Sequence, residues 1–278
     1  MNRYKMKYPV VSAIITTKNS SATLGALLES IKRQTFSKSE VVVVDNNSFD
    51  QTGQIAKKYT SKVYSKGPER SAQRNFGASK SQGEYLLFLD SDMVLTENVL
   101  DECVKRMVEE KVGGIIIPEK SFGNGFWAKV KALERKINEG EDYFEAARFF
   151  PKKIFRDMGG YDENLTGPED WDFPQRVARK YKIVRTHSYI LHNEGEPSLK
   201  SFAKRKYYYG LSVHKYLKKQ NLPAISPRTV YFLRRSFYKR WKELLVNPLL
   251  SAGMLLMLFV ESAAGGLGYL VGRFNNES

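Results

Sequence analysis

Two carboxylates spaced two positions apart are the first groups in this chain that could do chemistry. Asp90 and Asp92 flank Ser91, directly after an apolar run at residues 85–89. Such a run is typical of a strand buried on both faces of a parallel sheet, and its acidic end would lie at the carboxyl edge, where open α/β folds bind ligands. Carboxylate oxygens on a short turn suit Mg²⁺ or Mn²⁺, which would bind a diphosphate. The alternative is a plain turn in which Asp90 caps a helix.

Two other predicted strands also end in polar residues. Apolar, β-branched runs at 10–16 and 41–44 are followed by polar segments that reach residues 21 and 48. The runs at 10–16, 41–44, 63–64, 85–89 and 113–117 alternate with helical patterns at 24–31, 50–59, 70–80 and 100–108. This alternation predicts a mostly parallel sheet with right-handed crossovers. The polar clusters 16–19, 45–47 and 90–92 would then meet at one edge, which predicts a nucleotide pocket.

A strong positive charge indicates an anionic partner. The 278 residues carry a net charge of +15 with a pI near 9.6, and nucleic acid, anionic lipid and phosphorylated substrates all fit that charge. A hydrophobic share of 42% excludes wholesale disorder. The single cysteine, Cys103, excludes a disulfide framework and a cysteine metal site, and it indicates a reducing compartment. No signal peptide is expected, because residues 10–16 are too short for one and fit a first strand better.

The C-terminal third distinguishes among these partners. Lysines and arginines mix with aromatic residues between 200 and 242, which suits an anionic bilayer surface or nucleic acid. Residues 248–272 follow with one charge, Glu261, over about the length of a bilayer span. A membrane partner is therefore expected and nucleic acid is not. Glu261 and nearby glycines leave open a spanning helix, two short helices within one leaflet, or a buried core helix. The preceding basic residues would place the rest of the chain on the cytoplasmic face of the cell membrane.

Several short motifs lie between residues 9 and 195. None of them is specific by itself, but their order along the chain is. They are, in turn, Thr16-Thr17-Lys18-Asn19, Val44-Asp45-Asn46-Asn47-Ser48, Gln73-Arg74-Asn75-x-Gly77, Gly83-Glu84-Tyr85, Asp90-Ser91-Asp92, Gly159-Gly160-Tyr161-Asp162-Glu163 and Glu169-Asp170-x-Asp172. In this order they resemble the family 2 glycosyltransferases of the GT-A fold. Lys18 and Asn46-Asn47 stand where an aromatic residue and Asp-Gly are common in that family.

The resemblance implies transfer of a sugar from a nucleotide diphosphate donor, with inversion at the anomeric carbon. Asp45 would hydrogen-bond the nucleobase, and the donor site would also contain Thr16, Thr17, Asn19, Asn47, Arg70, Arg74 and Ser91. Asp92 would bind a divalent metal, Mn²⁺ or Mg²⁺, with Asp90 supporting the ribose or the metal shell and His192 as a third ligand. Asp170 would be the general base on the acceptor hydroxyl, and Glu169 would position the acceptor or the donor sugar.

Each of these roles has a structural alternative. Asp45 could cap the next helix, and His192 could be a structural histidine. Arg74 could face solvent, although Arg70 and Arg74 are four residues apart and would share one helix face. The acids at 169, 170 and 172 could merely stabilise a helix N-terminus through its dipole.

We therefore expect an α/β protein with a GT-A catalytic domain at 1–197, a basic-aromatic helical region at 198–246 and a hydrophobic membrane-binding tail at 247–278. The expected function is metal-dependent, inverting sugar transfer from GDP-mannose or a UDP-sugar. The acceptor would be lipid-linked: a polyprenyl phosphate, a polyprenyl-diphosphate sugar or a glycolipid. Three alternatives are a sugar nucleotidylyltransferase, whose early Gly-rich phosphate loop is absent here, a nucleic-acid-binding protein and a non-catalytic membrane scaffold.

Overall fold

The structure, a computed structural model, describes residues 10–141, 144–226 and 229–277. The chain forms two compact units. The first consists of Met1–Pro118, Ala146–Glu163 and Phe173–His192, and the second of Glu119–Glu145, Asn164–Asp172 and Asn193–Ser278. The boundaries predicted at residues 197 and 246 separate segments by their expected function, whereas these units are defined by compactness. The functional boundaries therefore stay a prediction.

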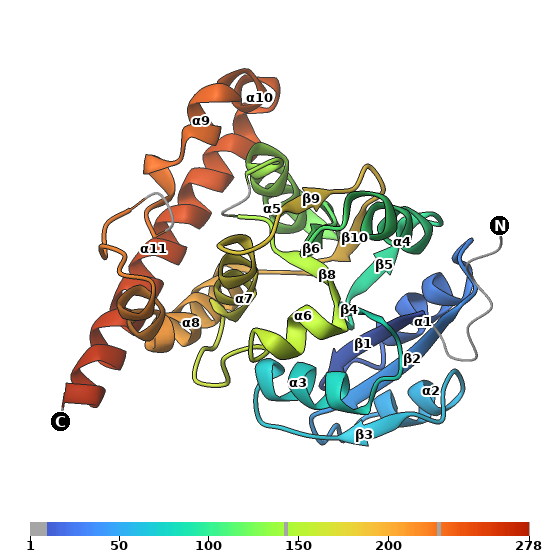
Figure 1. The fold of residues 1–278 in the computed structure, drawn as a ribbon. Coiled ribbons are helices and arrows are strands. Elements are labelled where there is room, and N and C mark those ends of the chain that lie inside the picture. Colours follow the sequence, from blue (N-terminus) through green and yellow to red (C-terminus); the bar gives the residue numbers. More distant parts are fainter. Residues whose placement is uncertain (1–9, 142–143, 227–228, 278) are drawn as a thin grey trace. The chain divides into compact units, whose positions relative to one another are not determined.

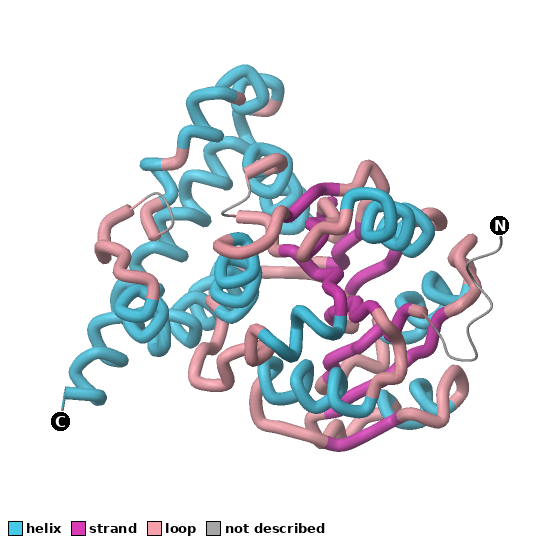
Figure 2. The backbone as a smooth tube through the Cα atoms, viewed as in Figure 1, coloured by secondary structure: helices cyan, strands magenta, loops and turns pink. Residues whose placement is uncertain are grey.

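A seven-stranded sheet is the centre of the first unit, as Figures 1 and 2 show. Its order is β3-β2-β1-β4-β8-β6-β9. β8 runs antiparallel to both of its neighbours, and the other pairs are parallel, which confirms the mostly parallel sheet expected from the sequence. The strands are β1 (Val11–Thr17), β2 (Ser39–Asp45), β3 (Val63–Ser65), β4 (Tyr85–Asp90), β6 (Gly114–Ile116), β8 (Ala147–Pro151) and β9 (Ile183–Arg185).

Helices cover both faces of this sheet. α1 (Leu24–Lys32), α2 (Thr52–Lys57) and α4 (Val99–Glu110) contribute to one hydrophobic core, whereas α3 (Arg70–Lys80) and α6 (Lys152–Asp157) contribute to another. The residues of β4 alternate between the two cores, because successive side chains of a strand point to opposite faces. The strand at 85–89 is therefore buried on both faces, as predicted. Beyond it, β5 (Met93–Leu95) pairs antiparallel with β10 (Ile190–Asn193), and Ser91 and Asp92 form the turn between β4 and β5.

The second unit is mainly helical. Apolar side chains of α5, α8 and α11, among them Val130, Phe202 and Met257, form its main core. α7 crosses the boundary, with Glu169–Asp172 in the second unit and Phe173–Ala178 in the first. The elements are β7 (Glu119–Phe122), α5 (Gly125–Asn138), α7 (Glu169–Ala178), α8 (Leu199–Lys219), a 3₁₀ turn (Tyr231–Leu233), α9 (Arg235–Lys239), α10 (Trp241–Val246) and α11 (Pro248–Glu277).

Glycines let the backbones of α8 and α11 touch. A Cβ on Gly268 would lie 2.2 Å from the carbonyl oxygen of Tyr207, and one on Gly272 would lie 2.1 Å from that of Leu211. No side chain fits at such distances, so glycine is required for this packing. α11 is one continuous helix, so of the alternatives left open by the sequence, the one with two short helices is wrong.

Glu261, the one charge expected in the apolar segment, is buried inside the second unit. The Nζ atoms of Lys131 and Lys206 lie 3.7 and 3.4 Å from its carboxylate oxygens, and the Tyr231 hydroxyl donates to it over 2.9 Å. Burial pushes the pKa of Glu261 upward, but the two lysines and the Tyr231 hydrogen bond outweigh burial and lower it. Glu261 is therefore ionised and neutralised by protein groups.

Replacing Glu261 by glutamine should lower the free energy of unfolding by about 3 kcal/mol, because the buried Lys131 and the half-buried Lys206 would both lose this counter-charge, and only Lys131 keeps another in Glu134. Because the pKa is lowered on folding, the wild-type contribution should be present above pH 4.5 and be lost as the pH falls through the folded pKa. Urea unfolding at several pH values measures both effects. The matched control is Glu243→Gln, since Glu243 pairs with the exposed Lys136 and should cost at most about 1 kcal/mol. Equal costs for the two variants would contradict the prediction.

Candidate active site

The ends of three strands carry the predicted donor-site residues to one edge of the first unit. In the sheet register, Thr17 of β1 lies opposite Asp45 of β2, and Thr16 of β1 lies opposite Asp90 of β4. The predicted convergence of the clusters at 16–19, 45–47 and 90–92 is therefore confirmed. Adjacent parallel strands place these side chains at the carboxyl edge, where α/β folds bind ligands.

Asp90 is held as a carboxylate by hydrogen bonds and arginines. The Thr16 hydroxyl donates to Asp90 Oδ1 over 3.2 Å, and Arg74 Nη2 donates to the same oxygen over 3.0 Å. Arg148 Nη1 lies 3.5 Å from Asp90 Oδ2. Burial acts to raise the pKa of Asp90, but Arg74, then Arg148 and Arg70, hold it well below its usual range. Asp90 thus stays charged, and its oxygens are already engaged.

The arginines around Asp90 come from separate elements. Arg74, on α3, is fully buried and its guanidinium lies 5.1 Å from the centre of the Tyr161 ring, so the alternative that it faces solvent is wrong. Arg70, one turn earlier on α3, acts on the same carboxylate, as their shared face predicted. Arg148 was not predicted. Its only signal is an arginine directly before Phe149-Phe150 in a short apolar strand.

Replacing Arg74 by methionine should destabilise the first unit by about 3 kcal/mol, because it removes the fully buried partner of the half-buried Asp90 carboxylate. The pKa of Asp90 should also rise, since its largest opposing charge is gone. Chemical denaturation measures the loss. Lys153→Met is the control, because Lys153 pairs with Asp157 at 2.7 Å but its side chain is 79% exposed, and it should cost less than about 1 kcal/mol. If both variants unfold at the same denaturant concentration, the Arg74–Asp90 pair contributes no more to stability than an exposed ion pair, which would contradict the prediction.

Asp92 and His192 form the group best suited to a metal. His192 lies opposite Met93 in the register of β10 and β5, which puts its Nε2 atom 3.5 Å from Asp92 Oδ2. Within the described part of the chain, Asp92 Oδ1 is buried and has no hydrogen-bond partner. A hard oxygen and an imidazole nitrogen suit Mn²⁺. The described residues contain no cluster of three metal-binding side chains, so a metal here would take its other ligand atoms from water, backbone oxygens or substrate.

The remaining predicted donor-site residues organise the loops after the strands. Asp45 accepts hydrogen bonds from the backbone N–H and the hydroxyl of Ser48, at 2.8 and 2.5 Å, so it caps its own loop. Asn19 and Asn47 both have positive φ, near 50°, a conformation that asparagine tolerates. The Asn19 side chain accepts from Phe49 N–H over 3.1 Å. Whether Asp45 also contacts a nucleobase stays a prediction.

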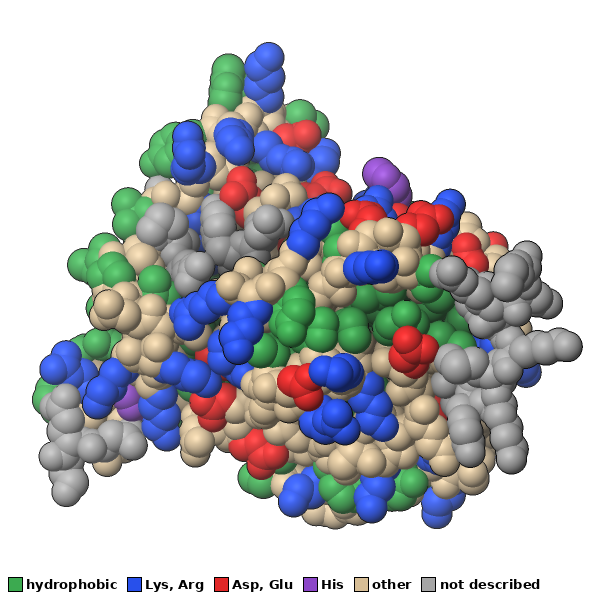
Figure 3. All heavy atoms as spheres, viewed as in Figure 1, with side chains coloured by type: hydrophobic (Ala, Val, Ile, Leu, Met, Phe, Trp, Pro, Cys, Tyr) green, Lys and Arg blue, Asp and Glu red, His purple; other side chains and the backbone are tan. Residues whose placement is uncertain are grey.

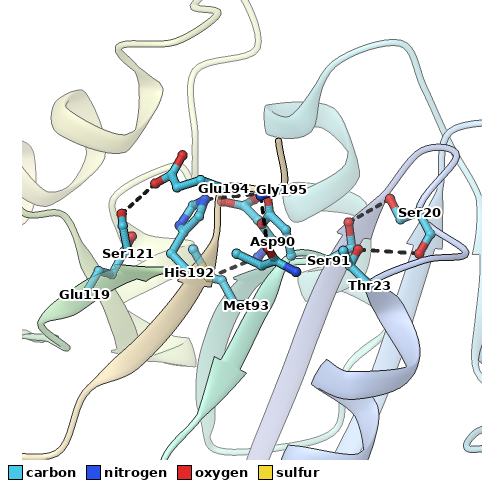
Figure 4. Close-up of polar contacts among 12 residues, drawn as sticks. Ser20, Thr23, Asp90, Ser91, Met93, Glu119, Ser121, His192, Glu194 and Gly195 are labelled. Atoms are coloured by element: carbon cyan, nitrogen blue, oxygen red, sulfur yellow. Dashed lines mark hydrogen bonds and ion pairs between the residues drawn. The ribbon is translucent and has the colours of Figure 1, made fainter. Parts of the chain in front are cut away.

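Two smaller hydroxyl-bearing residues complete this edge. The Ser91 hydroxyl donates to the Ser20 hydroxyl over 2.7 Å, a contact drawn in Figure 4, which ties the β4–β5 turn to the loop after β1. Thr17 is buried, and among the described residues its hydroxyl has no hydrogen-bond partner. Thr17 lies at the edge where Asp45 and Asp90 lie, but its hydroxyl oxygen is enclosed by protein in this structure.

The predicted base segment lies in the second unit. Glu169 is buried and Asp170 partly exposed, in the first turn of α7. Asp172 is buried and accepts from Lys219 Nζ over 3.0 Å and Gln220 Nε2 over 2.7 Å, at the end of α8. It therefore has a structural role that joins α7 to α8. The helix-dipole alternative for the other two acids stays open in this geometry.

The loop before α7 is also fastened to α8. Gly167 has φ of +97°, and a Cβ there would lie 2.6 Å from the Tyr209 ring. The backbone N–H of Thr166 donates to the Ser212 hydroxyl over 3.2 Å, and that hydroxyl donates to the Thr166 carbonyl over 2.7 Å. Contacts on both sides of Glu169 and Asp170 thus hold this segment against α8.

Comparison with known proteins identifies the family to which the chain belongs. Residues 12–161, more than half of the chain, match the family described as Glycosyl transferase family 2, and the chain belongs to that family. The matched region contains every predicted donor-site residue and Asp92. It ends before the predicted base segment and His192.

Three relatives are similar to particular parts of the chain. Cholesterol galactosyltransferase of Borreliella burgdorferi is 34% identical over 102 residues, which cover 34% of this chain and 28% of that protein. Poly(ribitol-phosphate) beta-N-acetylglucosaminyltransferase TarS of Staphylococcus aureus is 35% identical over 174 residues, 57% of this chain and 30% of that protein. A PGL/p-HBAD biosynthesis glycosyltransferase of Mycobacterium bovis is 28% identical over 202 residues, 67% of this chain and 76% of its own length. The chain thus spans under a third of the first two relatives.

Solved structures confirm the expected GT-A fold. The mannosyltransferase PcManGT from Pyrobaculum calidifontis, in complex with GDP-Man and Mn²⁺, superposes with a TM-score of 0.58 at 18% identity, over 97% of this chain and 80% of that one. S. aureus TarS 1–349 in complex with UDP-GlcNAc gives 0.56 at 20% identity, over 96% and 91%.

Proposed function

We propose that this protein is an inverting, metal-dependent glycosyltransferase that uses a nucleotide-diphosphate sugar. The observation that carries the proposal is the edge of the first unit. There a half-buried, ionised Asp90 lies beside arginines, and Asp92, one oxygen of which has no hydrogen-bond partner among the described residues, lies beside His192. A donor diphosphate is the anion that such cations and a divalent metal would bind.

In this mechanism the chain's own residues orient the donor and manage one proton. Asp92 and His192 would hold Mn²⁺ or Mg²⁺, which when bound supplies positive charge to the diphosphate leaving group. Arg74 and Arg148 keep Asp90 ionised and fixed in position. Asp170 accepts the proton of the acceptor hydroxyl as its oxygen attacks the anomeric carbon, and a single displacement of this kind inverts the configuration.

The donor is GDP-mannose or a UDP-sugar. PcManGT is solved with GDP-Man and Mn²⁺, and TarS with UDP-GlcNAc, so both classes occur among proteins of this fold. The test is a panel of nucleotide sugars incubated with the full chain and Mn²⁺, with release of the nucleoside diphosphate and calorimetric binding as separate readouts. One donor should bind and turn over well above the rest. No binding of any donor would overturn the proposal.

The acceptor is lipid-linked, at a membrane surface, and the basic residues between 200 and 242 favour the cytoplasmic side. Two observations support the lipid acceptor and the membrane. α11 is long and apolar enough for membrane contact, with a mean hydropathy of 1.7 over an 18-residue window within Pro248–Asn275, and one relative is named a cholesterol galactosyltransferase. Comparing transfer to a polyprenyl phosphate, a glycolipid and a free sugar tests the acceptor class. A free sugar that performs as well as the lipids would contradict it.

A further inference from the structure

One face of α11 packs against protein from Gly253 to Gly272. At its start, Gly253 packs so closely on α5 that a Cβ would lie 2.6 Å from the Phe126 ring. In its middle, Glu261 is enclosed by Lys131 and Lys206. Towards its end, Gly272 meets the backbone of α8. Positions three or four apart repeat this pattern, as expected for one stripe of a helix with 3.6 residues per turn.

The opposite face of α11 is exposed and apolar. Phe259 and Phe274 are 66% and 65% exposed. Together with four leucines that are about half exposed, these two phenylalanines form an apolar stripe along the helix. Their spacing places all six side chains within about a third of the helical circumference. The stripe consists of Leu255, Leu256, Phe259, Leu267, Leu270 and Phe274.

α8 prevents α11 from crossing a bilayer. The two helices are in backbone contact at Gly268 and Gly272, so a crossing α11 would carry α8 into the hydrocarbon. A Cβ on Gly265, in the middle of α11, would lie 3.7 Å from the carbonyl oxygen of Lys206, so the exposed Lys204 and Arg205 are level with the middle of α11. A crossing α11 would therefore bring these charges near the bilayer centre, where they are costly.

Residues before α11 have the composition of a headgroup layer. Tyr238 and Trp241 are exposed on α9 and α10, with Leu245 and Val246 exposed shortly after. Exposed basic residues lie among them: Arg235, Lys239 and Lys242. Figure 3 shows hydrophobic side chains together with lysines and arginines over the helical part that carries these elements. Aromatic rings at headgroup depth, cations for anionic lipid and apolar groups for the acyl region match one bilayer surface.

We propose that α11 lies in the plane of an anionic membrane surface, with the apolar stripe in one leaflet and the opposite face on α5 and α8. The chain is then bound to a single leaflet. The proposal rests on the membrane partner of the proposed function. A second copy of this chain is a poorer occupant for the stripe, because pairing would bring the basic segments of two copies together.

Depth measurements along the stripe test this placement. Single cysteines at Leu256, Phe259, Leu267 and Leu270 carry nitroxide labels in the full chain, bound to vesicles of phosphatidylcholine and phosphatidylglycerol. Cys103 is buried, and the parent chain controls for its labelling. All four labels should report one similar, shallow depth. Label depths that increase along the helix to the bilayer centre would overturn the proposal. Labels in contact with labels of a second copy, and not with lipid, would also overturn it.

Accessibility supplies an independent readout. Asn275→Cys, at the end of α11, should react with an impermeant maleimide on sealed vesicles as fast as Glu97→Cys in the first unit. If Asn275→Cys is protected from the maleimide until detergent is added, α11 spans the membrane and the proposal is overturned.

Vesicle binding tests the stripe itself. Phe259→Glu should weaken vesicle binding at least about tenfold, whereas Val108→Glu, an exposed apolar position on α4, should not. Donor turnover is measured in parallel, so a spanning α11 with intact turnover would leave the proposed function standing.

Discussion

Replacing Asp170 by asparagine is expected to abolish sugar transfer while donor binding persists. Asparagine keeps the size of the side chain but cannot accept a proton from the acceptor hydroxyl. Loss of a general base typically costs 10²- to 10⁴-fold in rate. The expected result is therefore a fall in kcat of about this size, with an unchanged dissociation constant for the donor by calorimetry.

A matched variant separates base catalysis from helix stabilisation. Asp101 also lies in the first turn of a helix, α4, and is exposed. If Asp170 acted only through the helix dipole, both Asp→Asn changes would cost about 0.3–1 kcal/mol of stability and neither would change the rate. The base assignment requires a rate loss in the Asp170 variant alone. Normal turnover in that variant would end the assignment.

The sheet and its edge could be predicted because their signals are local. Each strand of the parallel part is an apolar run of its own, and polar residues follow β1, β2 and β4 directly in the sequence. The convergence of these residues needs only the rule that parallel strands end at the same edge. The fully buried β4 was predictable for the same reason, since its apolar run is continuous.

Arg148 could not be predicted, because its position depends on pairing between distant segments. β8 inserts between β4 and β6, and Phe150 lies opposite Leu86, 64 residues earlier, in the register. A short apolar strand shows neither its partners nor the direction in which it runs. The arginine next to Phe149 therefore had no visible counter-charge until Asp90 was placed beside it.

The glycines of α11 left its division into two short helices open for a related reason. Glycine lowers helix propensity, so a helix with several glycines suggests a break. Here Gly268 and Gly272 allow close contact with α8, and tertiary packing outweighs propensity. The structural role of Asp172 could not be predicted either, because its partners Lys219 and Gln220 follow it by more than forty residues.

α11 also forms part of the core of the second unit, so deleting residues 247–278 would disrupt that core. Point variants therefore test the membrane contact more cleanly.

Replacing Asp92 by asparagine should remove metal-dependent transfer with little effect on folding. In the described part of the chain its Oδ1 atom has no hydrogen-bond partner, and its side chain is 41% exposed. The free energy of unfolding should therefore change by less than about 0.5 kcal/mol. If Asp92 holds the metal, several kcal/mol of leaving-group stabilisation are lost, and the rate should fall about 10³-fold.

Metal binding itself distinguishes this role from a general loss of charge. Mn²⁺ titration in the presence of a nucleoside diphosphate should show much weaker binding for the Asp92 variant and an intermediate loss for His192→Gln, because His192 supplies the neighbouring nitrogen. Glu97→Gln, an exposed acid just after β5, is the control and should bind Mn²⁺ as the wild type does. An Asp92 variant that keeps both its rate and its Mn²⁺ affinity would exclude this residue as a ligand. The ionised Asp90 would then be the carboxylate to test, despite the arginines that already engage it.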